Sequence, residues 1–144
     1  MLTRKFHGPR RFVSCEDPAV SDGYEEYVKN SYDYDKLDID PAQTPTVFGI
    51  EPLITTLANA VDDLPMGRTR DVQIVRGGLV SVTGLTLEKD DGSKRECPKV
   101  ERSRVGNLGE MLTEAWFEET SLQGWLLAEI AQAIWRITEP DPLS

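Results

Sequence analysis

Four aspartates crowded into one short segment form the densest group of metal-ligating side chains in the sequence: Asp33, Asp35, Asp38 and Asp40. Calcium favours such a group, because it binds several oxygens that the carboxylates of one loop can supply. Counted from Asp33, an EF-hand loop requires glycine at the sixth position and glutamate at the twelfth, whereas this chain has Asp38 and Thr44 there. We therefore expect no calcium and no other metal in this segment.

The other nucleophiles and bases lie apart from one another along the chain. His7 is the only histidine, and the two cysteines, Cys15 and Cys97, do not form a CxxC pair. A zinc site or a base–nucleophile pair needs partners that this sequence lacks. It also contains no glycine-rich phosphate-binding motif, and its neighbouring acid pairs are typical of turns and helix ends. We therefore expect no catalytic residue, no cofactor and no enzymatic activity.

Large aromatic side chains offer a different chemistry, which is the burial of ring surface against a partner protein. In the expected C-terminal helix, Trp135 shares one apolar face with Leu127 and Ala131, and we predict that these three residues bind protein. Trp125 and Ile130 belong to the other apolar face, which we predict to be core. A helix with two apolar faces is typical of an element that is buried on two sides.

Residues 1–45 are predicted to form an extended arm, because Gly-Pro, Asp-Pro and Asp-Gly pairs interrupt them and no apolar period persists. The arm carries a charge of +4 over residues 1–12, and then −7 over residues 13–40 from nine acids and two bases. It also holds four tyrosines that we predict to contact a neighbouring protein subunit: Tyr24, Tyr27, Tyr32 and Tyr34. Deleting residues 1–44 is then expected to leave the rest of the chain folded.

Residues 46–144 are predicted to form one compact domain, whose elements follow from apolar spacing and turn signals. The expected elements are a strand at 46–50, a helix at 53–64, a helix ending at Val75, a hairpin of 85–89 with 93–100, a capped helix at 108–116, and a helix from about 120 to 137. The predicted fold class is therefore α+β. It is mainly helical in its C-terminal part, with a short strand and a β-hairpin, and an extended N-terminal arm precedes it.

The net charge of −9 over 144 residues limits the partners that we expect. An acidic surface repels phosphate backbones, so nucleic-acid binding by the folded domain is not expected. The apolar stretches are too short and too interrupted to cross a bilayer, so we expect no membrane association. The partners that remain are proteins, including other copies of this chain in a homo-oligomer.

Residues 46–138 resemble small bacteriophage proteins that are known as tail assembly chaperones. The resemblance rests on a strand entering Glu51-Pro52-Leu53 and a helix, the segment Arg76 to Leu85, the turn Asp91-Gly92, and two C-terminal helices ending in Ile134 to Thr138. It implies a non-catalytic, chaperone-like role in virion (tail) assembly, in the bacterial host cytoplasm, with the tape measure or tail subunits as partners. The alternative is a structural virion protein, such as a connector, minor tail or cement subunit, whose arm laces onto neighbouring subunits.

Overall fold

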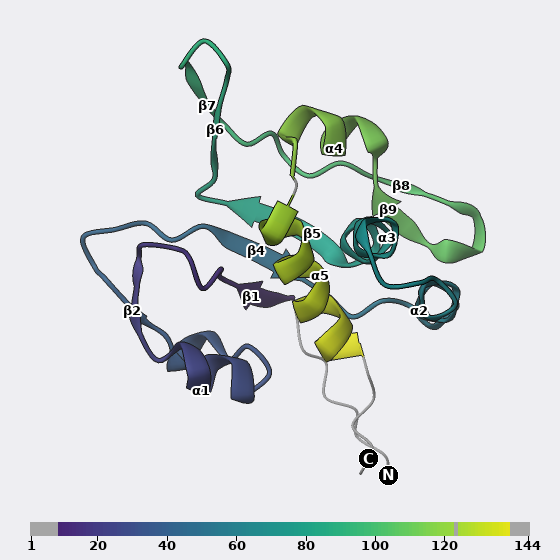
Figure 1. The fold of residues 1–144 in the computed structure, drawn as a ribbon, viewed down its shortest axis with the longest axis horizontal. Coiled ribbons are helices and arrows are strands. Elements are labelled where there is room, and N and C mark those ends of the chain that lie inside the picture. The colour runs from purple at the N-terminus through teal and green to yellow at the C-terminus, as the bar shows by residue number, and fades with distance from the viewer. Residues whose placement is uncertain (1–8, 123, 139–144) are drawn as a thin grey trace.

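The computed structural model describes residues 9–122 and 124–138. Figure 1 shows a mixed α/β fold, in which 41% of the described residues are helical and 22% lie in strands. The central sheet is antiparallel, with the strand order β1 (Arg10–Phe12), β4 (Val47–Ile50) and β5 (Leu79–Thr83). The other strands form antiparallel pairs, which are β2 (Val20–Asp22) with β3 (Asp38–Ile39), β6 (Thr86–Glu88) with β7 (Lys94–Glu96), and β8 (Arg102–Arg104) with β9 (Glu110–Leu112).

Strand β4 is the middle strand of the central sheet, which confirms the strand predicted at 46–50. Its β-branched and aromatic residues suit a pleated surface, and Phe48 and Ile50 are buried. Phe48 lies opposite Phe12 of β1 on one side and opposite Val82 of β5 on the other. The sheet therefore joins residues from the predicted arm to residues from the predicted domain.

Three predicted helices are present with shifted ends: α2 (Thr55–Asp62), α3 (Arg68–Gly78) and α5 (Gly124–Thr138). α3 continues past its predicted end at Val75, and α5 begins at Gly124 rather than near residue 120. α3 packs against α5, and Gly78 permits their close approach, because a Cβ at this position would clash with Cγ2 of Ile134. α5 crosses in front of the central sheet in Figure 1. Its last residue, Thr138, accepts a hydrogen bond from the backbone N–H of Leu53 at 3.0 Å. None of the helices in the described ranges is long and apolar enough to cross a membrane.

The segment 106–120 differs from its prediction. The β6–β7 hairpin is present as expected, but the capped helix predicted at 108–116 is wrong. Instead, a 3-10 turn η2 (Gly106–Leu108) precedes β9, and α4 (Glu114–Thr120) follows it. Gly106 and Gly109 have φ of 52° and 77°, which a right-handed helix does not accommodate. The helix cap is Thr113, whose side chain accepts a hydrogen bond from the backbone N–H of Trp116.

The N-terminal third is folded rather than extended. Besides β1, β2 and β3, it contains helix α1 (Tyr24–Lys29) and a 3-10 turn η1 (Tyr34–Lys36). The hydroxyl of Tyr27 donates a hydrogen bond to the carbonyl of Arg11 and accepts one from the N–H of Val13, while the hydroxyl of Tyr24 donates to the carbonyl of Val13. These tyrosines therefore tie α1 to β1.

The predicted fold class is wrong, because helices and strands are spread through the chain and the first third is not an extended arm. One hydrophobic core contains buried residues from both sides of residue 45, including Phe12 and Tyr27 before it and Ile50 and Ile134 after it. Isolated apolar residues in a segment without periodicity supply this part of the core, so the hydrophobic pattern did not indicate it. His7 and the basic residues Arg4 and Lys5 lie outside the described residues.

Candidate protein-binding surfaces

The residues predicted to bind protein on α5 are mostly buried. Leu127 and Ala131 are 2% and 1% exposed, and both belong to the hydrophobic core. Trp135 is half-buried, and the guanidinium carbon of Arg70 lies 4.7 Å from the centre of its ring. Of these three residues, only Trp135 therefore has side-chain surface that a partner could contact.

Trp125 is the exposed tryptophan of α5, so the prediction that it is core is wrong. Its side chain is 61% exposed, whereas Ile130 and Ile134 are fully buried. The helical repeat gives the reason: nine residues separate Trp125 from Ile134, which amounts to about two and a half turns. The two side chains therefore lie on opposite sides of α5.

The exposed side of α5 forms a continuous stripe that we call the α5 face. It consists of four half-buried or exposed residues spaced at i, i+3, i+7 and i+10: Trp125, Ala128, Gln132 and Trp135. This stripe extends along about 15 Å of the helix. Beside its C-terminal half lies a cavity of about 340 Å³, which is partly lined by Met66, a side chain that is 82% exposed.

The four tyrosines predicted to contact another subunit pack within their own chain. Tyr27 and Tyr32 are 0% and 6% exposed, and their ring centroids lie 5.4 Å apart in an edge-to-face arrangement. Tyr24 and Tyr34 are half-buried, and the guanidinium carbon of Arg11 lies 4.0 Å from the centre of the Tyr34 ring. Burial raises the pKa of Tyr24 and of Tyr27, as expected for phenols held away from water. Their main contribution is therefore to the fold.

Next to Trp125, a cavity of about 450 Å³ is lined by Cys15, Glu16, Trp125 and Glu129. Oε2 of Glu129 accepts a hydrogen bond from the backbone N–H of Cys15 at 3.0 Å. Oε1 of Glu129 is buried and has no hydrogen-bond partner among the described residues. The neighbouring Glu129 carboxylate, and after it desolvation, raises the pKa of Cys15 to about 11. Cys15 is therefore protonated at neutral pH and is a poor nucleophile.

Replacing Glu129 with glutamine should make the Cys15 thiol more reactive. The pKa of Cys15 should fall from about 11 toward 9.0, because the negative charge that opposes thiolate formation is removed. Near pH 8 the thiolate fraction should then rise by up to about 90-fold, and the rate of alkylation by iodoacetamide by up to about tenfold, because a thiolate of lower pKa is also a weaker nucleophile. The rates are compared across pH in a Cys97→Ser background. Glu16→Gln should have a smaller effect, and equal rates in all three proteins would contradict this assignment.

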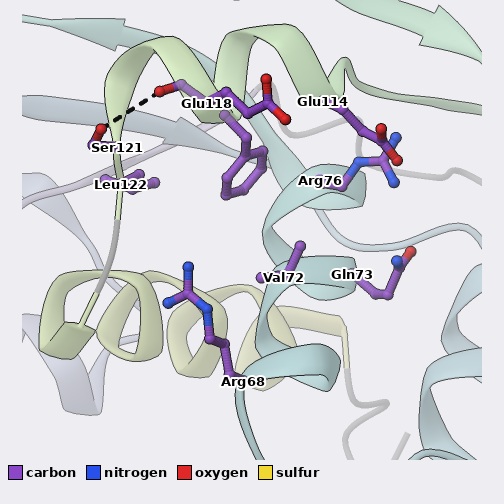
Figure 2. A pocket seen from close by; sticks show the side chains of 9 residues that line it. Arg68, Val72, Gln73, Arg76, Glu114, Glu118, Ser121 and Leu122 are labelled. Carbon is purple, nitrogen blue, oxygen red and sulfur yellow. Dashed lines mark hydrogen bonds between the residues drawn. The ribbon is translucent and has the colours of Figure 1, made fainter.

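A second surface lies between α3 and α4, where a cleft of about 450 Å³ opens between the two helices. Figure 2 shows Arg68 and Arg76 on the α3 side and Glu114 and Glu118 on the α4 side. The lining also includes the polar side chains of Gln73 and Ser121 and three apolar side chains, Val72, Phe117 and Leu122, which we call the floor. We call this feature the α3–α4 cleft.

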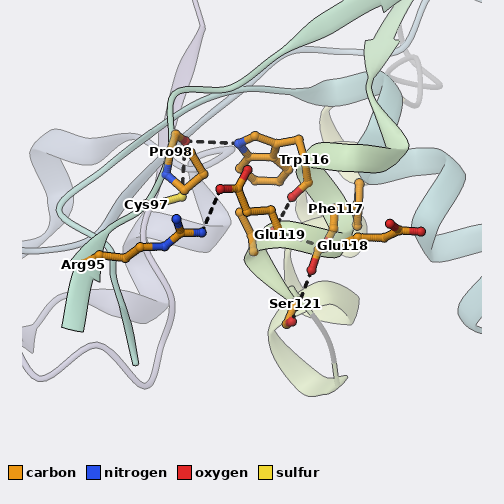
Figure 3. Close-up of polar contacts among 9 residues, drawn as sticks. Arg95, Cys97, Pro98, Trp116, Phe117, Glu118, Glu119 and Ser121 are labelled. Carbon is orange, nitrogen blue, oxygen red and sulfur yellow. Dashed lines mark hydrogen bonds and ion pairs between the residues drawn. The ribbon is translucent and has the colours of Figure 1, made fainter. Parts of the chain in front are cut away.

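Three contacts fix the α4 wall of the cleft in place. Trp116, which is 2% exposed, donates a hydrogen bond from Nε1 to the carbonyl of Pro98 at 3.1 Å (Figure 3). Arg95 of β7 forms an ion pair of 2.8 Å with Glu119 (Figure 3). The cap at Thr113 fixes the start of the helix. The α4 wall is therefore held in place by residues that do not themselves line the cleft.

Two aspartates of the acidic segment, Asp33 and Asp40, serve as turn-forming residues. Asp33 accepts a hydrogen bond from the N–H of Asp35, and Asp40 accepts one from the N–H of Ala42. Within the described residues, no group of three or more histidine, cysteine, aspartate or glutamate side chains is placed to hold a metal ion.

Neither surface could be assigned from similarity to another protein. Comparisons with protein-family models, with curated proteins and with solved structures found no match for this chain. The sequence interpretation also missed both Trp125 as an exposed residue and the α3–α4 cleft. The helical angle between Trp125 and Ile134 could have identified the first, whereas the second depends on how α4 is placed in space.

Proposed function

We propose that this chain is a non-catalytic protein-binding protein that contacts its partner through the α5 face. The observation that carries the proposal is the 61% exposure of Trp125, on a helix whose opposite side lies in the core. Tryptophan is enriched among the interface residues that contribute most to binding energy. Holding its ring on a packed helix lowers the ordering cost of association, because the helix does not have to form on binding.

The chemistry around Trp125 supports a partner that presents both apolar and basic groups. The ring supplies apolar area, and its face attracts cations. Glu16 and Glu129 line the adjacent cavity, and among residues 9–122 and 124–138 no basic residue lines it. A lysine or arginine of the partner would place its aliphatic stem on the ring and its charge near these carboxylates.

We further propose that binding takes place during virion (tail) assembly, in the host cytoplasm, with the tape measure or a tail subunit as partner. This narrower statement rests on the resemblance of residues 46–138 to tail assembly chaperones. The alternative is a structural virion protein, such as a connector, minor tail or cement subunit. Mass spectrometry of purified particles separates the two, because a stoichiometric copy number in particles would contradict the chaperone role.

Trp125→Ala should weaken partner binding by at least about tenfold, since truncation of a tryptophan at the centre of an interface commonly costs 2 kcal/mol or more. Binding is measured by calorimetry or biolayer interferometry with co-expressed tape-measure and tail subunits as candidate partners. Ile54→Ala is the matched control, because Ile54 is 50% exposed but lies outside the α5 face. An unchanged affinity in Trp125→Ala, for a partner that binds the unaltered protein, would refute the role of the α5 face.

A further inference from the structure

We propose that the α3–α4 cleft binds an amphipathic helix of a partner protein, with acidic residues along one edge of the helix and basic residues along the other. This inference goes beyond the proposed function, because it concerns a surface separate from the α5 face. The lining of the cleft contains none of the residues of the α5 face.

The basic and the acidic residues of the cleft lie on different walls. Arg68 and Arg76 stand two turns apart on α3, and Glu114 and Glu118 stand one turn apart on α4. The ion pairs among the described residues are Lys29–Glu25 and Arg95–Glu119, so no ion pair connects the two walls of the cleft. Arg76 uses its Nε to donate to the carbonyl of Leu112 at 2.9 Å, which holds its side chain beside the cleft. A partner can therefore complement both walls.

The floor and the length of the cleft fit about two turns of a helix. Val72 and Phe117 are half-buried and Leu122 is 6% exposed, so the floor supplies apolar surface at the base of the charged walls. Phe117 belongs to α4 and lines the cleft. The distance along α3 from Arg68 to Arg76 corresponds to about 12 Å of helix, or slightly more than two turns. An apolar stripe with residues at i, i+3, i+4 and i+7 would cover this floor.

The backbone of the walls favours a helix over an extended segment. α3 and α4 are helices, whose backbone N–H and C=O groups are largely bonded within each helix. An extended partner would find no strand edge here, and its own buried backbone groups would lose their hydrogen bonds. A helix satisfies its backbone internally and needs only side-chain contacts. Binding in the cleft therefore corresponds to the helix-in-groove mode of recognition.

The test uses three labelled helical peptides of about 15 residues that share one apolar stripe. The first has glutamate along one edge of the stripe and lysine along the other, the second has glutamate along both edges, and the third has lysine along both. Each like-charged peptide places one edge against a wall of the same sign, in either direction of binding. We expect the mixed peptide to bind about 3- to 10-fold more tightly than the other two in fluorescence anisotropy at low ionic strength.

Charge-reversal variants test which walls create this preference. Arg68→Glu cancels the net charge of the α3 wall, so the lysine-edged peptide should gain affinity and the mixed peptide should lose it. Glu118→Lys should in the same way favour the glutamate-edged peptide. Lys89→Glu is the matched control, because Lys89 is exposed on the β6–β7 turn and its reversal changes the net charge by the same amount as Arg68→Glu.

Equal affinities for the three peptides, no binding up to about 1 mM, or the same response to Lys89→Glu as to Arg68→Glu would overturn the proposal. Trp125→Ala should leave the binding of the mixed peptide unchanged, because Trp125 does not line the cleft. Failure of the peptide experiment therefore leaves the proposed function of the α5 face standing, and failure of the α5 face leaves the cleft proposal standing.

Discussion

A variant that lacks residues 1–44 should show no cooperative thermal transition in circular dichroism. The deletion removes strand β1 from the central sheet and takes five large side chains out of the core: Phe12, Val13, Tyr27, Tyr32 and Leu37. Truncating a single buried aromatic residue costs about 3–5 kcal/mol, and a whole domain is stable by only about 5–15 kcal/mol. The loss therefore exceeds the stability of the protein. This expectation reverses the one that follows from the sequence alone.

Point variants in the intact chain separate the contribution of α1 from that of β1. Tyr27→Ala should lower the free energy of unfolding by about 3–5 kcal/mol, because the ring is fully buried and its hydroxyl is hydrogen-bonded to Arg11 of β1 and to Val13 just after it. Glu25→Ala is the control on the same helix, and we expect it to change stability by less than about 0.5 kcal/mol. A cooperative transition in the truncated protein would show that the N-terminal third is dispensable for the core.

Trp116→Ala should destabilise the protein by about 3–5 kcal/mol, whereas Trp125→Ala should cost less than about 1 kcal/mol. The two tryptophans are 2% and 61% exposed, so only the first leaves a cavity in the core when it is truncated. Trp116 also loses its hydrogen bond from Nε1 to Pro98. Urea unfolding followed by circular dichroism measures both differences.

The experiment decides which of the two tryptophans contributes more to stability. A loss in Trp125→Ala as large as the loss in Trp116→Ala would mean that Trp125 is packed, and the α5 face would then lack its anchor. Trp116→Phe serves as a second variant if Trp116→Ala does not fold, because it retains an aromatic ring and removes the indole N–H. We expect Trp116→Phe to be intermediate in stability.

Long periodic segments could be predicted from the sequence, and short aperiodic ones could not. α5 has an apolar repeat over four turns, and β4 has a run of β-branched and aromatic residues, so both were identified. The elements of the N-terminal third contain only two to six residues each, which is too short for a period to appear. Their side chains are buried in the shared hydrophobic core by contacts that no local pattern encodes.

The binding surfaces, too, could be predicted from the sequence only in part. Trp125 and Trp135 were both recognised as large apolar residues of one helix, but the assignment of faces placed Trp125 in the core. The α3–α4 cleft depends on α4, whose start was misplaced because the apolar residues of β9 and α4 together resemble one helical repeat, although the positive φ of Gly106 and Gly109 excludes a helix there. Sequence spacing therefore located the tryptophans, and tertiary structure decided which of them a partner can reach.

The hydroxyls of Tyr24 and Tyr27 also affect whether another strand can pair with the β1 edge of the central sheet. β1 is an edge strand, and an unpaired strand edge is a template on which another chain can add a strand. The carbonyl of Arg11 in this strand, and the carbonyl and N–H of Val13 just beyond its end, are already bonded to the two phenols. The side chains of a short helix thus take the place of a fourth strand. They close this side of the sheet to strand exchange between molecules.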